Sequence, residues 1–131
     1  MPRTKPRPAR SAIERALGEA SWLLSHAQAL TDYGRKDEAS AELARAAVAE
    51  EQAACLLEAA GREEEASIHR ISAASCYEDL GQYARAVTFL RAALSVHLPS
   101  DYRKRVADQL RRCLATVQKE SKRAAVQSAN G

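Results

Sequence analysis

The fold of this chain is decided by one stretch and its two variants. The stretch reads Ala74-Ser75-Cys76-Tyr77-Glu78-Asp79-Leu80-Gly81-Gln82-Tyr83-Ala84-Arg85-Ala86-Val87. Gly81 stands between two runs of helix formers, and the same arrangement surrounds Gly34 and Gly61, each with an alanine five residues after the glycine. Glycine readily adopts the left-handed conformation that ends many helices. Each glycine therefore predicts a turn between two antiparallel helices.

The composition favours an all-α fold in a single domain. Alanine supplies 28 of the 131 residues, whereas valine, isoleucine and aromatic residues, which favour strands, are scarce. A chain of this length can bury a core without metals or disulfides. The three cysteines are odd in number and lack metal-binding spacing, and no apolar run is long enough for a membrane span or a signal segment. We therefore expect a cytoplasmic protein.

Charge divides the chain into three parts. Residues 1–10 contain four bases and no acid, residues 11–98 eight bases and fourteen acids, and residues 99–131 eight bases and three acids. The first part also contains three prolines and little apolar surface, so we expect a disordered basic arm over 1–10. A single helical domain is expected over 11–120, followed by a frayed basic tail over 121–131.

Apolar residues recur every three or four positions in five segments, which is the pattern of amphipathic helices. The segments cover about 11–33, 36–60, 62–80, 82–97 and the residues from Ser100 onward, and Pro99 ends the fourth. The expected architecture is five antiparallel helices that form a short stack of helical hairpins or a plain bundle.

Aligning the chain on its three glycines reveals a weak internal repeat. A small residue stands seven positions before each glycine and again five and twelve positions after it, and a large apolar or aromatic residue stands four positions before it. These positions hold Ala27, Ala54 and Ala74; Leu30, Leu57 and Tyr77; Ala39, Ala66 and Ala86; and Ala46, Ala73 and Ala93. Small residues at fixed points allow neighbouring helices to approach closely.

This pattern resembles the tetratricopeptide repeat (TPR), a helical hairpin unit with alanines at fixed positions. The resemblance covers residues 20–98 and is best developed around Gly81. The glycines are 27 and 20 residues apart, where a regular TPR array repeats at about 34 residues, so the family pattern is divergent here. The resemblance implies a non-enzymatic adaptor or scaffold that binds a protein partner.

If the chain stacks as TPR proteins do, the resemblance also implies a concave face lined by the first helices of the hairpins. Acidic residues lie between the packing positions, so a basic or amphipathic peptide is the expected ligand. Trp22 lies on a second face of its helix, either as an interface anchor or packed under a neighbouring helix or the N-terminal arm. The candidate partner-binding residues are Trp22, Asp32, Glu51, Glu58, Glu78 and Asp79.

Two charged residues interrupt the apolar stripes. Glu50 lies on the stripe of the second helix and Arg70 on that of the third, where an unpaired charge would be costly to bury. In a hairpin with its turn at Gly61 the two residues are nearly level. The sequence therefore predicts an inter-helix ion pair between Glu50 and Arg70 that sets the register of the hairpin.

Sequence motifs of catalysis are lacking. The chain has no glycine-rich phosphate loop and no nucleophile elbow, and its three histidines fall in three different helical segments. The spacing of histidine, cysteine and carboxylate residues matches neither a zinc site nor a di-iron bundle. We therefore expect no enzymatic activity, no catalytic residue, no cofactor and no bound metal.

An alternative function of a different class involves the last helix. Basic residues on the side opposite its apolar stripe, together with the N-terminal arm, would bind nucleic acid or another acidic surface. A solvated helix that caps the end of a repeat stack would show the same pattern. The residues of this basic face are Lys104, Arg105, Arg111, Arg112 and Lys119. The sequence leaves the identity of the partner and the oligomeric state open.

Overall fold

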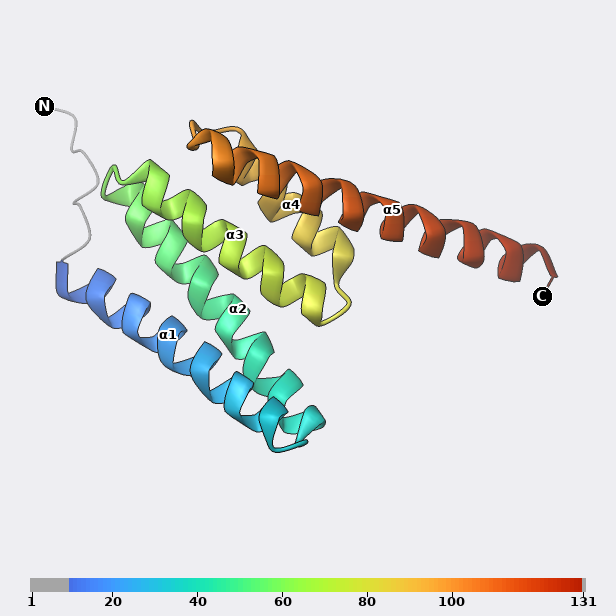
Figure 1. Cartoon of the computed structure of the whole chain (residues 1–131), viewed down its shortest axis with the longest axis horizontal. Coiled ribbons are helices and arrows are strands. Elements are labelled where there is room, and N and C mark those ends of the chain that lie inside the picture. The colour runs from blue at the N-terminus through green and yellow to red at the C-terminus, as the bar shows by residue number, and fades with distance from the viewer. Residues whose placement is uncertain (1–9, 131) are drawn as a thin grey trace, which may run out of the picture.

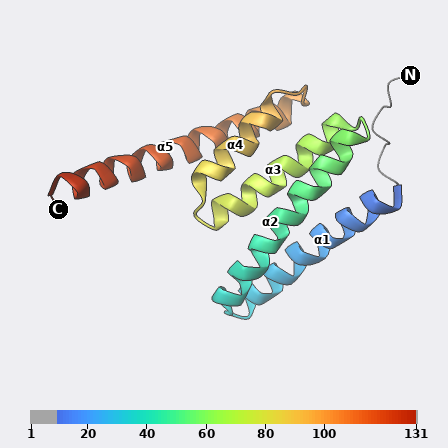
Figure 2. The same cartoon turned by 180° about the vertical axis from the view of Figure 1, so that it is seen from behind.

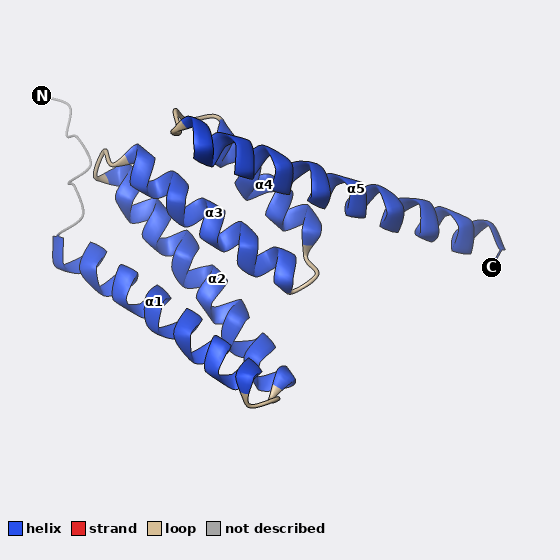
Figure 3. Ribbon diagram, in the orientation of Figure 1, coloured by secondary structure: helices blue, strands red, loops and turns tan. Residues whose placement is uncertain are grey.

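The computed structural model describes residues 10–130. The predicted basic arm lies outside the described residues, except for Arg10, which begins the first helix. The described part is helical almost throughout (Figure 3), and its five helices are α1 (Arg10–Asp32), α2 (Lys36–Ala59), α3 (Glu63–Asp79), α4 (Tyr83–Leu94) and α5 (Ser100–Asn130). The predicted all-α fold is confirmed.

Each helix packs antiparallel against the next one in the chain. The succession from α1 to α5 is visible in Figure 1, where α5 lies in front of α4, and in Figure 2, where α4 lies in front of α5. Helix α5 also reaches α3, because the Gln109 amide donates hydrogen bonds to Ser75 Oγ and to Glu78. The second half of α5 extends beyond the other four helices (Figure 1).

All three glycines adopt the predicted left-handed conformation. The φ angle is +75° at Gly34, +78° at Gly61 and +77° at Gly81. At each turn, the amide of the residue after the glycine donates a hydrogen bond to the carbonyl of the residue four positions before the glycine. At Gly61, Arg62 N donates to Leu57 O at 2.9 Å. This bond satisfies one of the carbonyls that would otherwise be left unpaired at the end of a helix. The next helix begins two residues after each glycine. The three turns are equivalent, because they share the same glycine conformation and the same hydrogen bonds.

The internal repeat corresponds to a packing register. All twelve repeat positions are buried, and the most exposed of them, Leu30, is only 8% exposed. The alanine five residues after each glycine also forms a backbone hydrogen bond at the turn. Its amide donates to the carbonyl of the residue that follows the glycine. Small side chains at these points let the helix backbones come close.

Larger side chains gather in two clusters among these alanines. Leu90, Val106 and Cys113 are at most 2% exposed and join α4 to α5 in the main cluster. Ile13 and Leu57 form a smaller cluster near the turn between α2 and α3. The two clusters together bury apolar surface from all five helices, which is the main stabilising contribution to the fold.

The structure differs from the expected boundaries at the C-terminal side. Helix α4 ends at Leu94, three residues before the expected end, and α5 continues to Asn130 instead of ending near residue 120. Every residue from Gln118 to Asn130 is exposed. Lysine, arginine, alanine and glutamine are good helix formers, so the helix continues here without a packing partner.

Replacing Gly81 by alanine is expected to lower the free energy of unfolding by about 1–2 kcal/mol, because a side chain disfavours the left-handed conformation. Apart from Gly81 and its two chain neighbours, no residue has a heavy atom within 4 Å of a Cβ built at Gly81, so the cost arises from the backbone alone. Gly18 is the matched control: it lies inside α1 with equally open space, and Gly18→Ala should stabilise the protein by up to about 1 kcal/mol. Urea denaturation measures both, and equal effects would contradict the interpretation.

Candidate functional site

The predicted Glu50–Arg70 ion pair is corrected by the structure. The buried Glu50 carboxylate accepts a hydrogen bond from His69 Nδ1 at 2.5 Å, while the Arg70 guanidinium donates to Glu58 at 2.7 Å. Both pairs still join α2 to α3. The short His69 side chain brings its ring to the buried carboxylate, whereas the long Arg70 side chain extends toward the exposed Glu58 near the turn. The inward charge of Glu50 was predicted, but its partner was wrong.

A second histidine–glutamate pair joins α2 to α1. Glu42 is only 8% exposed, and its carboxylate accepts a hydrogen bond from His26 Nδ1. The Arg45 guanidinium lies 3.6 Å from the other carboxylate oxygen of Glu42. Helix α2 therefore has two buried glutamates, each bound by a histidine of a neighbouring helix. Glu42 is bound by His26 of α1, and Glu50 is bound by His69 of α3.

Trp22 stacks on His26 and remains open to solvent. The two ring centroids are 4.9 Å apart with an interplanar angle of 26°, and 61% of Trp22 is exposed. Within the described residues, the structure therefore excludes packing beneath a neighbouring helix. The N-terminal arm, which the sequence also allowed as a cover for Trp22, lies outside the described residues. Trp22 lies at the edge of a hollow between α1 and α2.

This hollow continues along α2 into a second one. The first, of about 660 Å³, is bordered by Trp22, Arg45 and Val48, and the second, of about 710 Å³, by Val48, Leu56 and Tyr77. They share Val48 and Gln52, so they form one surface, here called the Trp22 groove. From Arg45 to Cys55 the groove follows α2 for about 15 Å at 1.5 Å per residue. Val48 on its floor is 49% exposed.

The far end of the Trp22 groove is polar. The Tyr77 hydroxyl donates a hydrogen bond to Glu51, and the Arg85 guanidinium lies 5.2 Å from the centre of the Tyr77 ring. Burial, together with the hydrogen bond to Glu51, raises the pKa of Tyr77 to about 12. The phenol is therefore protonated at neutral pH and keeps Glu51 in place at the groove edge.

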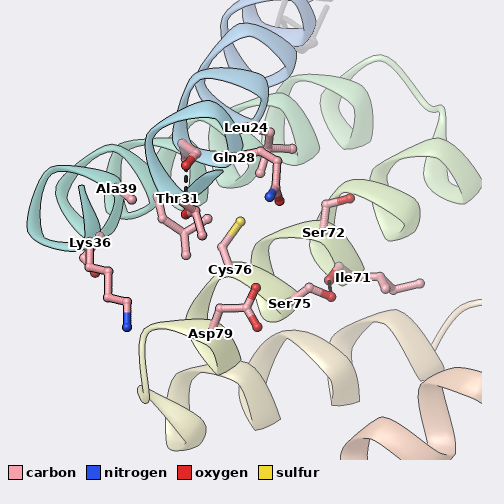
Figure 4. A pocket seen from close by; sticks show the side chains of 13 residues that line it. Leu24, Gln28, Thr31, Lys36, Ala39, Ile71, Ser72, Ser75, Cys76 and Asp79 are labelled. Carbon is pink, nitrogen blue, oxygen red and sulfur yellow. Dashed lines mark hydrogen bonds between the residues drawn. The ribbon is translucent and has the colours of Figure 1, made fainter. Parts of the chain in front are cut away.

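A separate groove opens between α1 and α3 (Figure 4). It has a volume of about 670 Å³ and is bordered by Leu24 and Gln28 of α1, Lys36 of α2, and Cys76 and Asp79 of α3. Burial is the main cause that raises the pKa of the Cys76 thiol to about 12, so the thiol is neutral and a poor nucleophile. Partial burial, followed by the nearby Glu78 carboxylate, raises the pKa of Asp79.

The structure separates the acidic residues that the sequence grouped on one face. Glu51 lies in the Trp22 groove and Asp79 in the α1–α3 groove. Asp32 accepts from Gln28, and Glu58 accepts from Arg70. The fifth, Glu78, accepts two hydrogen bonds from Arg112, which lower its pKa, and so connects α3 to α5. Of the six predicted partner-binding residues, only Trp22 and Glu51 share a groove.

Sequence reasoning missed Val48, Gln52, Leu56 and Arg85 as groove residues. Val48 and Leu56 are apolar residues outside the main stripe of α2, and such off-stripe apolar residues were the available signal. Arg85 carried no signal, because only the packing of α3 between α2 and α4 places it beside Tyr77.

The predicted basic face lies along α5, and two of its residues are engaged. Arg111 pairs with Asp108 on the same helix, and Arg112 pairs with Glu78. The Arg105 guanidinium lies 5.1 Å from the centre of the Tyr102 ring. Lys104 and Lys119 are exposed and, among the described residues, have no ion-pair partner.

Other types of site find little support in the described residues. Between Arg10 and Asn130 no three histidine, cysteine or carboxylate side chains are close enough together to hold a metal ion. None of the helices in this range combines the length and the apolar character that crossing a bilayer requires. No protein-family model, no curated protein and no solved structure matches the chain.

Proposed function

We propose that this protein is a non-enzymatic interaction module, an adaptor or scaffold of TPR-like type, that binds an amphipathic segment of a partner protein in the Trp22 groove. The exposure of Trp22 on this groove is the observation that supports the proposal most directly. A tryptophan that is 61% exposed leaves a large apolar surface in water. Tryptophan is also the residue type that most often anchors protein interfaces.

The chemistry of the groove defines the expected partner. Trp22, Val48 and Leu56 offer an apolar floor, which favours a segment with apolar side chains on one face. Charges of both signs, Glu51 and Arg85 at one end and Arg45 at the other, border that floor. The mixed charge favours an amphipathic partner over a purely basic one.

The regular placement of the helices supports the TPR-like part of the proposal. Three equivalent glycine turns and twelve buried repeat positions give a stack in which consecutive hairpins share helices. Such stacks act in general by presenting the surfaces between their helices to partners. The Trp22 groove is a surface of this kind, because α1, α2, α3 and α4 all contribute to it.

Affinity purification with the wild-type chain and with Trp22→Ala tests the proposal. A partner that is retained by the wild type should be lost with the variant, and its purified complex should weaken about 30-fold or more, the effect of about 2 kcal/mol at an interface anchor. Because Trp22 is the only tryptophan, its fluorescence reports binding directly. Its emission should shift to shorter wavelength when the partner covers the ring.

The matched control is Tyr33→Ala. Tyr33 is an aromatic residue in the turn after α1 that is 83% exposed and lies outside both grooves. This change should leave the affinity within about twofold of the wild type, as expected for an aromatic residue outside the interface. Equal loss of the partner with both variants, or none with Trp22→Ala, would refute the groove as the binding site.

A further inference from the structure

Helix α5 has basic residues along one side for most of its length. Its 31 residues extend about 46 Å at 1.5 Å per residue. At 100° per residue, seven bases fall within an arc of about 120°, and the buried residues Val106 and Cys113 lie on the opposite side. We call this set the α5 basic stripe: Lys104, Arg105, Arg111, Arg112, Lys119, Lys122 and Arg123.

Five of these seven bases are available for a ligand. Arg111 is paired with Asp108, and Arg112 is needed to connect α5 with Glu78 of α3. Within residues 10–130, no carboxylate lies within ion-pair distance of the others, which are Lys104, Arg105, Lys119, Lys122 and Arg123. All five are exposed. Unpaired bases in a row create a positive potential that attracts a polyanion.

The free bases of the stripe lie in two groups on the same side of the helix. Lys104 and Arg105 lie near its start, and Lys119, Lys122 and Arg123 begin about 21 Å further along. From Lys104 to Arg123 the stripe covers about 29 Å. The part from Gln118 onward extends beyond the helical stack, so a large ligand can approach it without contacting α1 or α2.

We infer that the α5 basic stripe binds the phosphate backbone of double-stranded nucleic acid without sequence preference. Charge complementarity between the stripe and the phosphates is the basis of this binding. The stripe lies on α5, away from the α1–α2 end of the Trp22 groove, so this interaction is independent of the proposed protein partner.

Two features of α5 favour a duplex over other polyanionic ligands. The single aromatic residue of α5, Tyr102, lies at its start beside Arg105, whereas single strands are usually held by bases that stack on several aromatic rings. An acidic membrane would be bound more strongly by a helix with a free apolar face. In the first half of α5 that face packs against the stack through Val106 and Cys113, which are at most 2% exposed, and from Gln118 to Asn130 the single large apolar residue is Val126.

Fluorescence anisotropy with a labelled 20-base-pair duplex of random sequence tests the inference. For the full chain, log K should fall linearly with log salt concentration between 50 and 200 mM NaCl, with a slope of about −4.5 for five phosphate contacts. The triple change Lys119→Ser, Lys122→Ser and Arg123→Ser should flatten the slope to about −1.8 and weaken binding at 100 mM salt at least ~100-fold. These three residues are exposed, so circular dichroism should show an intact fold.

A variant with the same net charge serves as the control. It carries Arg15→Ser, Lys36→Ser and Arg91→Ser, three exposed bases on α1, α2 and α4. It should bind the duplex within about threefold of the wild type, because these bases lie outside the stripe. Equal losses in the two variants would overturn the inference, since net charge alone would then explain binding.

Three further results would also overturn it. The first is no duplex binding at 50 mM salt, and the second is tighter binding to a single-stranded oligonucleotide of the same length. The third is binding to vesicles that contain phosphatidylserine without binding to the duplex, which would identify an acidic membrane as the ligand. Trp22→Ala should leave duplex binding unchanged, so a failure of the groove proposal is distinguishable from a failure of this one.

Discussion

Replacing His69 by alanine is expected to lower the free energy of unfolding by about 3 kcal/mol, because it leaves a buried carboxylate without its partner. Glu50 is 3% exposed, and its carboxylate accepts the hydrogen bond from His69 at 2.5 Å. Removing one member of a buried pair is much more costly than removing both. Adding Glu50→Gln to His69→Ala should therefore restore part of the lost stability, and urea denaturation of the two variants measures the difference.

Arg70→Met distinguishes the observed pair from the one predicted by the sequence. Arg70 is bound to Glu58, whose side chain is 54% exposed, so the loss of this ion pair should cost less than about 1 kcal/mol. Methionine keeps the apolar contacts of the arginine stem. If Arg70→Met destabilised the protein as much as His69→Ala, the assignment of His69 as the partner of Glu50 would be incorrect.

Leu90→Ala is the second change with a large expected effect, a loss of about 3 kcal/mol. Leu90 is 0% exposed, and it lies on the short helix α4 between α3 and α5. Leu90 packs in the main cluster with the equally buried Val106 and Cys113 of α5, so its truncation would leave a cavity between α4 and α5. Thermal and urea denaturation should both show the loss.

Val126→Ala is the corresponding control for Leu90→Ala. Val126 lies in the part of α5 that extends beyond the stack and is 58% exposed. Removal of its methyl groups creates no cavity, so the free energy of unfolding should change by less than about 0.5 kcal/mol. A similar loss for both variants would mean that α4 is not packed as described.

The sequence predicted the turns and the packing positions well, for a local reason. The positive φ angle at Gly34, Gly61 and Gly81 follows from the absence of a Cβ atom, and the helices on either side follow from the periodicity of nearby apolar residues. Burial of the repeat alanines follows from the same register. Helix ends were less accurate, because the end of α5 depends on helix propensity in a segment without apolar contacts.

The candidate site was predicted only in part, because it depends on contacts between helices. Trp22 and Glu51 were both singled out, yet nothing in the sequence indicates that they share a groove with Val48. The neutralisation of Glu78 by Arg112 involves residues 34 positions apart. The packing of α2 against α3 decided the partner of Glu50, since it brings His69 to the buried carboxylate and Arg70 to Glu58.

The sequence by itself determined which residues turn, which form helices and which of them are buried, because backbone conformation and apolar periodicity are properties of neighbouring residues. Only the tertiary structure decided which charges are paired and which remain free. It placed only Glu51 and Asp79 of the predicted acidic face in grooves, and it left five bases of the α5 basic stripe without a carboxylate partner within residues 10–130. Pairing depends on the distance between side chains of different helices, and that distance is set when the helices pack.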